Sequence, residues 1–387
     1  MNRKLIAYLF ICFAMVIVFN ACVKDKEIIW NSNPDLQIQL CWNKAYDLET
    51  KEKVEVGLQW SLSFLGATLP TNKYSHALIW QADNKIQLNI TELGFSLPAQ
   101  NALAQLIKAI KQSEEYSLYQ SVDIGRWIML TLNSSNHYYK ITGALNNYTQ
   151  FKEQFLFSDS LGAIVESAVS KGERKIYLSN ANKANQMAFI AAEGQGSLPN
   201  HTFTEDKHEV LNIMDNGQLR FAIYDNAGQL IPTSDSMYTF AGKPAKCLWC
   251  HEIVIQEPFS AVTDVDGYRT IENFKSFISS KMNLLQSYRN TLQSVVNFNH
   301  RQDHTFAELL YISFMETSAE RLAQEWNMSV AQVRQRLVGI PTHRHIEFDF
   351  LGDLYNRKDI DELGPYGYIK VPDSAREKSV YEPDLIR

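Results

Sequence analysis

The sequence lacks the features that mark many enzyme classes and the nucleic-acid-binding proteins. It contains no phosphate-binding P-loop, no nucleophile elbow and no spacing of paired carboxylates above background. It also lacks a basic excess, since its 387 residues include 37 lysines and arginines against 43 aspartates and glutamates, for a net charge of −6. Binding to nucleic acid requires a basic surface, so we expect no nucleic-acid partner.

Cysteines are scarce as well, and their positions argue against a disulfide framework. The chain has five of them, namely Cys12, Cys22, Cys41, Cys247 and Cys250. A zinc site requires four nitrogen or sulfur ligands, and the sequence contains no second C-x-x-C to complete one. A redox dithiol is expected near a βαβ pattern, which is not visible here. Zinc, a redox dithiol and a simple disulfide nevertheless stay open as alternatives for the pair at 247 and 250.

The most specific motif in the chain is Cys247-Leu248-Trp249-Cys250-His251. The C-x-x-C-H spacing is that of covalent haem attachment, in which both thiols form thioethers and the histidine becomes the proximal iron ligand. Over these five residues the chain resembles the c-type cytochromes. The resemblance implies one covalent haem c held by Cys247, Cys250 and His251, and it implies no particular reaction.

Haem attachment of this kind takes place outside the cytoplasm, and the N-terminus predicts that the chain is exported. Arg3 and Lys4 precede an apolar run over residues 5–19, which is short for a membrane span. Ala21-Cys22 resembles the end of a bacterial lipoprotein signal, although Phe19 and Asn20 depart from the usual pattern. We therefore expect a signal peptide at 1–21, lipid on Cys22 and a bacterial envelope location, with the outer membrane favoured because position 23 is not Asp.

The remaining sequence predicts an α+β fold in two parts after a tether at 22–53. Residues 54–240 are expected to be rich in strands, with segments at 54–64, 76–80, 85–93, 122–132 and 137–142, and one clear helix capped by Ser96. Asn216-Gly217 between apolar runs predicts a hairpin within 208–232. Residues 241–387 are expected to form a mainly helical part that carries the haem.

The sixth iron ligand would decide what such a haem does, because a Met or His favours electron transfer and an open position permits peroxide or gas chemistry. The candidates for this ligand are Met315, His343 and His345, ahead of Met282. We expect Met282 to be core filler on an apolar helix face.

The leading functional hypothesis is one-electron transfer between redox proteins of the envelope, in which case the chain is a carrier rather than an enzyme. One alternative is a haem peroxidase-like enzyme or gas sensor with an open distal site. A second alternative is a binding or scaffold lipoprotein in which the haem is structural, because the β-rich part is larger than an electron carrier needs. The sequence does not indicate an oligomeric state.

Overall fold

The computed structural model describes residues 33–256 and 264–387, so the predicted signal peptide and Cys22 lie outside the described residues. From Asp35 to Arg387 the chain forms one compact unit. The boundary predicted between residues 240 and 241 lies inside this unit and stays a prediction. No helix among the described residues is long and apolar enough to cross a membrane.

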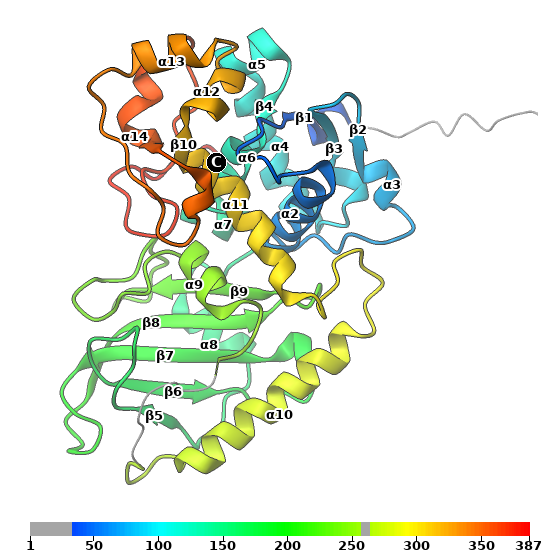
Figure 1. The fold of residues 1–387 in the computed structure, drawn as a ribbon. Coiled ribbons are helices and arrows are strands. Elements are labelled where there is room, and N and C mark those ends of the chain that lie inside the picture. The colour runs from blue at the N-terminus through cyan, green and yellow to red at the C-terminus, as the bar shows by residue number, and fades with distance from the viewer. Residues whose placement is uncertain (1–32, 257–263) are drawn as a thin grey trace, which may run out of the picture. The chain divides into compact units, whose positions relative to one another are not determined.

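The predicted α+β class is confirmed. The two larger sheets are built from strands that precede residue 225, and the chain after residue 243 is mostly helical (Figure 1). The strands are β1 (Gln37–Cys41), β2 (Leu78–Trp80), β3 (Lys85–Asn89), β4 (Val122–Asp123), β5 (Gly162–Ile164), β6 (Arg174–Leu178), β7 (Ala188–Gln195), β8 (Thr204–Ile213), β9 (Leu219–Tyr224), β10 (Glu316–Ser318) and β11 (Leu354–Asn356). The helices are α2 (Lys51–Phe64), α3 (Tyr74–Ala77), α4 (Leu97–Lys111), α5 (Glu114–Tyr119), α6 (Ile124–Thr131), α7 (Ser135–Thr142), α8 (Tyr148–Gln154), α9 (Pro244–His251), α10 (Ile271–Arg289), α11 (His304–Met315), α12 (Ala319–Glu325), α13 (Val330–Arg336) and α14 (Arg357–Ile360).

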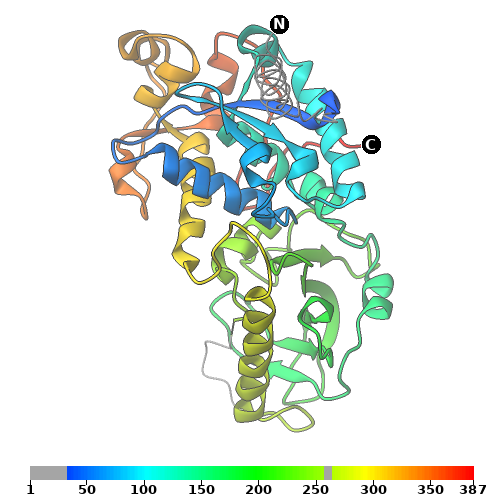
Figure 2. The same ribbon diagram turned by 90° about the vertical axis from the view of Figure 1, so that its right-hand side faces the viewer.

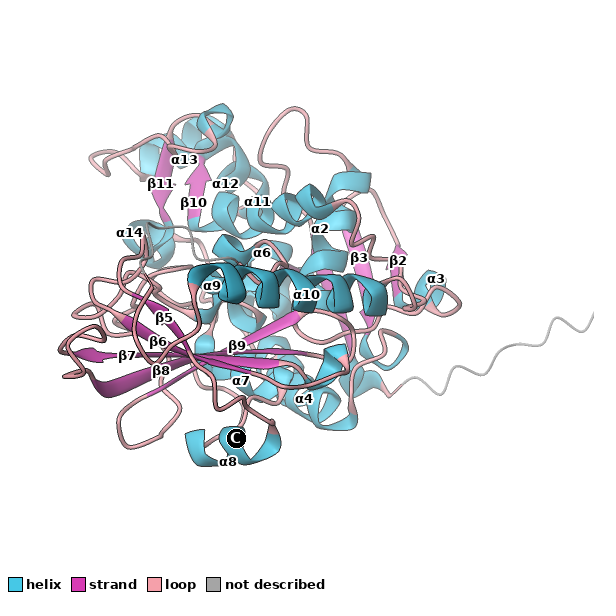
Figure 3. Ribbon diagram, turned by 90° about the horizontal axis from the view of Figure 1, so that it is seen from below, coloured by secondary structure: helices cyan, strands magenta, loops and turns pink. Residues whose placement is uncertain are grey.

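A five-stranded antiparallel sheet, in the order β5-β6-β7-β8-β9, is the larger of the two main sheets. Its strands follow one another in sequence, so each pairs with its neighbour through a short connection. The hairpin predicted within 208–232 joins β8 to β9 and is confirmed. Seen from below, α9 and α10 lie on one side of this sheet and α8 on the other (Figure 3).

The second sheet has the order β2-β3-β1-β4, and helices surround it (Figure 1). Helices α2 and α11, which are far apart in the sequence, lie side by side in both Figure 1 and Figure 2. Gly57 allows their close approach, because a Cβ atom there would lie 2.7 Å from the carbonyl oxygen of Phe306. The core therefore combines elements from both of the predicted parts.

Three of the predicted strands are wrong, because each segment is mainly helical. Residues 54–64 lie in α2, which Thr50 caps by accepting a hydrogen bond from the N–H of Lys53. Residues 122–132 form strand only at β4, after which the Asp123 carboxylate accepts from Gly125 and starts α6. Residues 137–142 lie in α7, which Ser134 caps. β-branched and aromatic residues suggested strands, but capping and burial against other helices determine the outcome. The predicted helix after Ser96 is confirmed as α4.

A buried network of arginines and carboxylates joins α6, α12 and α14 around the ring of Phe314. The guanidinium carbons of three arginines lie 3.9 to 5.3 Å from the centre of that ring: Arg126, Arg321 and Arg357. Glu325 pairs with all three. One of its oxygens lies 2.8 Å from Arg321, and the other lies 2.7 Å from Arg357 and 3.7 Å from Arg126. Because these charges are buried, each one depends on its partners for compensation of lost hydration.

Candidate functional site

Helix α9 carries the C-x-x-C-H motif on the side of the five-stranded sheet where α10 also lies (Figure 3). Pro244 occupies the first turn, where its missing N–H costs no hydrogen bond. Ala245 and Leu248 are buried and fix the helix in the core. The other side of α9 then carries Cys247, Cys250 and His251 into the lining of a cavity.

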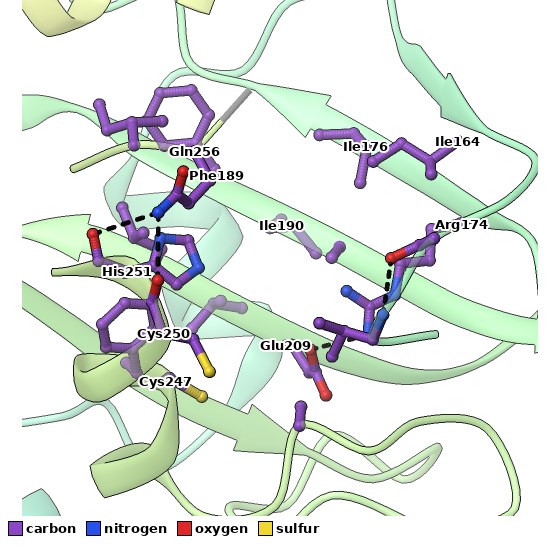
Figure 4. A pocket seen from close by; sticks show the side chains of 18 of the residues that line it. Ile164, Arg174, Ile176, Phe189, Ile190, Glu209, Cys247, Cys250, His251 and Gln256 are labelled. Atoms are coloured by element: carbon purple, nitrogen blue, oxygen red, sulfur yellow. Dashed lines mark hydrogen bonds and ion pairs between the residues drawn. The ribbon is translucent and has the colours of Figure 1, made fainter. Parts of the chain in front are cut away.

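This cavity has a volume of about 380 Å³, which lies within the range of small-molecule and cofactor sites. Its walls come from the sheet, α9 and α10, and its lining is mostly aliphatic and aromatic, including Ile164, Ile176, Phe189, Ile190, Phe221 and Phe274. In Figure 4 the three motif residues lie together on one side of the cavity, while Arg174 lies on the opposite side. The structure therefore combines an apolar chamber with the predicted attachment residues.

His251 is held in an orientation that leaves one ring nitrogen free for a ligand bond. Its Nδ1 lies 3.0 Å from the carbonyl oxygen of Val254, and its ring lies 4.9 Å from that of Phe221. A backbone carbonyl at Nδ1 fixes the tautomer with the proton on Nδ1 and the lone pair on Nε2, the usual second contact of a metal-binding histidine. Burial lowers the pKa of His251 to about 4, so the ring is neutral at pH 7.

The two motif thiols do not have the properties of a reactive dithiol. Burial raises the pKa of Cys247 well above its usual range, and the nearby Glu209 carboxylate adds to this effect. Cys250 is exposed at the surface, but partial desolvation still raises the pKa of its thiol, against compensation from Lys246. Redox-active cysteines have lowered pKa values because the thiolate is the reacting form. Within the described ranges no three His, Cys, Asp or Glu side chains converge as a metal site.

A charged cluster that the sequence analysis did not identify lies in the sheet beside the cavity. Arg174 on β6 pairs with Glu193 on β7 and lies 3.2 Å from Glu209 on β8 and 2.8 Å from the hydroxyl of Thr239. Arg174 and Glu209 line the cavity itself. Burial and the neighbouring Glu209 raise the pKa of Glu193 to about 7, and burial raises the pKa of Glu209. The sequence signal for this cluster is the interruption of apolar strands by charged residues.

None of the four candidate sixth ligands belongs to the cavity lining. The sulfur of Met282 accepts a hydrogen bond of 3.0 Å from the N–H of Ile255, and Met315 is buried at the end of α11. His343 Nε2 lies 2.7 Å from a carboxylate oxygen of Glu316.

The ring of His345 stacks on Phe348, and its Nδ1 accepts hydrogen bonds from the backbone N–H groups of Glu347 and Phe348. The structure therefore brings together the attachment residues but not the predicted distal ligands.

No family model, curated protein or solved structure matches this chain.

Proposed function

We propose that this protein carries one haem c in the cavity, attached through Cys247 and Cys250, with His251 as the proximal iron ligand. The observation that carries the proposal is that the motif opens into an apolar cavity while His251 has its Nδ1 engaged by a carbonyl. An apolar chamber excludes water from a porphyrin, and the free Nε2 has the lone pair that iron requires. A haem held by these residues would supply an iron that can exchange one electron or bind a small molecule.

The lining of the cavity favours an open sixth position over a closed one. Apart from His251, no histidine or methionine lines it among the described residues, and the charged side chains of its lining are Arg174, Glu209 and Lys246, the last of which pairs with Glu377. Neither a guanidinium nor a carboxylate supplies the strong ligand field that Met or His gives to an electron carrier. We infer a protein that binds and reduces or senses a small molecule at the iron, as in the peroxidase-like or gas-sensing alternative.

The first test is the spectrum of the haem-loaded protein. We expect ferric iron to be high-spin and the ferrous form to bind carbon monoxide readily. Met282→Leu, Met315→Leu and the double substitution His343→Ala with His345→Ala should leave the spectrum unchanged, because these side chains do not line the cavity. A low-spin spectrum that becomes high-spin in one of these variants would reject the open site and identify the sixth ligand.

A second candidate function, one-electron transfer with a partner protein, is favoured by a chain of aromatic rings. Trp249 lies between the two haem cysteines, and its ring centre is 6.0 Å from that of Phe348. Phe348 is 5.9 Å from Phe350, which is 58% exposed. Closely spaced aromatic rings shorten the through-space steps of electron tunnelling, so this chain offers a route from the motif to the surface.

This route can be tested with a ruthenium photosensitiser on a cysteine introduced at Phe350. We expect laser-induced reduction of the haem from this label to be several-fold faster than from a label at Val338, which is 80% exposed and outside the aromatic chain. Phe348→Leu should slow only the first of these rates without changing the haem spectrum. Equal rates from both labels, or no effect of Phe348→Leu, would argue against the route.

We further propose that the mature chain is anchored in the bacterial envelope, with the outer membrane favoured, through lipid on Cys22. The apolar run and the Ala21-Cys22 sequence support this. Mass spectrometry of the mature N-terminus tests it, since an unmodified N-terminus at another residue would reject the lipid.

A further inference from the structure

The charged cluster beside the cavity contains a carboxylate, that of Glu209, which the proposed haem attachment does not use. Glu209 lines the cavity, and its Oε1 is buried without a hydrogen-bond partner. Buried polar groups normally have a partner, so an orphaned oxygen in a cavity wall indicates a ligand that supplies one. On the same face of the sheet, Glu209 lies in register with Ala191, which lies in register with Ile176. Arg174 and Glu193 lie on this face two residues away along β6 and β7.

Arg174 on β6 holds the Glu209 carboxylate in place. Its guanidinium contacts Glu209, Glu193 and Thr239 through one nitrogen, which fixes Glu209 from one side and leaves Oε1 open. The cluster combines one cation with two carboxylates. With both carboxylates ionised it would carry an uncompensated buried negative charge, which a single proton shared between them removes.

We propose that Glu209 is the proton acceptor of the cavity, which takes the proton from a small acidic ligand of the type HX as X⁻ binds the iron. This inference rests on the proposed function, because it requires haem with an open axial position. Arg174 is a positioning residue, and Glu193 tunes the basicity of Glu209 by its charge. The ligand class is that of small neutral acids such as hydrogen peroxide and hydrogen cyanide.

Hydrogen cyanide is a suitable probe because its binding involves no oxidation or reduction. The H–C bond breaks, the proton passes to the Glu209 carboxylate, and the carbon lone pair forms the bond to ferric iron. Electrons and atoms balance without a further reactant. Carbon monoxide has no proton to donate, so its binding to ferrous iron reports on the same cavity without using Glu209.

The other charged and titratable groups around this carboxylate are few. β6 contributes Arg174, β7 contributes Glu193, and α9 contributes Lys246 with the motif residues Cys247, Cys250 and His251. The residues of α10 that line the cavity, Phe274 and Ile278, are apolar. Burial and the negative charge of Glu193 both favour the proton on the Glu209–Glu193 pair, and Arg174 opposes this.

The experiment measures proton release and rate when cyanide binds the ferric haem-loaded protein in weakly buffered solution with a pH indicator. At a pH where Glu209 is ionised, we expect the wild type to release much less than one proton per cyanide bound. Glu209→Gln should release a full proton and bind cyanide about 10²-fold more slowly, the lower range for the loss of a general base. The rate of carbon monoxide binding should be unchanged in this variant.

Two further variants make the test specific. Glu193→Gln removes a negative charge beside Glu209, so the rise of the cyanide-binding rate with pH should move to lower pH. Glu205→Gln is the matched control, because Glu205 lies on the same strand but bonds Lys175 and Tyr177 outside the cavity lining. It should bind cyanide as the wild type does.

The outcomes distinguish a failure of the open iron position from a failure of the role of Glu209. A wild type that carries haem but binds no cyanide overturns the open site and this inference with it. A wild type that binds cyanide, with equal proton release and rate in Glu209→Gln, overturns the role of Glu209 alone. An equal slowing of carbon monoxide binding also overturns it, because the variant then acts on the cavity and not on the proton.

Discussion

Replacing Cys247 and Cys250 together with alanine is expected to abolish covalent haem. Co-expressed with a bacterial cytochrome c maturation system, the wild-type protein should retain haem staining after denaturing electrophoresis, because thioether bonds survive denaturation and iron coordination does not. The double variant has no thiol in the cavity to form these bonds, and we expect complete loss of the stain.

Cys41→Ala is the matched control for this experiment. Cys41 is a free cysteine, as Cys247 and Cys250 are, but it lies on β1, outside the cavity lining. Burial raises the pKa of its thiol to about 12. This variant should stain like the wild type. A wild-type protein without covalent haem under these conditions would reject the proposed function, whatever the behaviour of the variants.

The C-x-x-C-H motif is recognisable in the sequence because it is defined by local spacing. Five consecutive residues specify the two thiols and the histidine, and the structure places them on a single short helix. Asn216-Gly217 and Ser96 were equally informative, because a tight turn and a helix cap are each determined by a few neighbouring residues.

The segments at 54–64 and 137–142 were misread because tertiary contacts determine their structure. Leu58 and Leu62 are buried in α2, which packs against α11 some 250 residues later. Thr50 and Ser134, which cap the two helices, are signals present in the sequence, but β-branched and aromatic residues carried more weight in the prediction.

The charged cluster beside the cavity could not be predicted from local sequence patterns. Arg174, Glu193 and Glu209 are distributed over three strands, and only the register of the sheet brings them together. In the same way, Met315 was a candidate because of its residue type and its distance along the chain from His251, and His343 and His345 were candidates because they follow the loop at 339–342. Neither property specifies whether a side chain faces the cavity.

The second large effect is expected on stability, from Glu325→Gln in the buried network around Phe314. Both oxygens of Glu325 bond Arg357, at 2.7 and 2.8 Å, and one also bonds Arg321. The substitution leaves these buried guanidinium groups without their shared anion. Removing one partner of a buried ion pair costs about 3–5 kcal/mol, so we expect the free energy of unfolding at pH 7, measured by urea denaturation, to fall by that amount.

The pH dependence of this difference provides a sharper test than its size. Although burial alone would raise the pKa of Glu325, Arg357 and Arg321 hold it at about 2 in the folded protein, below about 4.3 in the unfolded chain. A carboxyl group with a lowered folded pKa contributes stability that is fully present above the unfolded pKa and is lost as the pH falls through the folded pKa. The gap in unfolding free energy between wild type and Glu325→Gln should therefore be constant from pH 7 to about pH 5 and shrink between about pH 4 and pH 2.

Glu320→Gln separates this effect from a general sensitivity of α12 to loss of charge. Glu320 lies in the same helix and contacts Arg334 at 2.6 Å, but both side chains are more than half exposed. Water and salt screen such a pair, so we expect a change within about 1 kcal/mol and little dependence on pH. A similar loss in both variants, or a gap for Glu325→Gln that persists at pH 2, would mean that the network does not depend on the ionised Glu325. The three arginines around Phe314 would then owe their place to packing and cation–π contacts rather than to the shared anion.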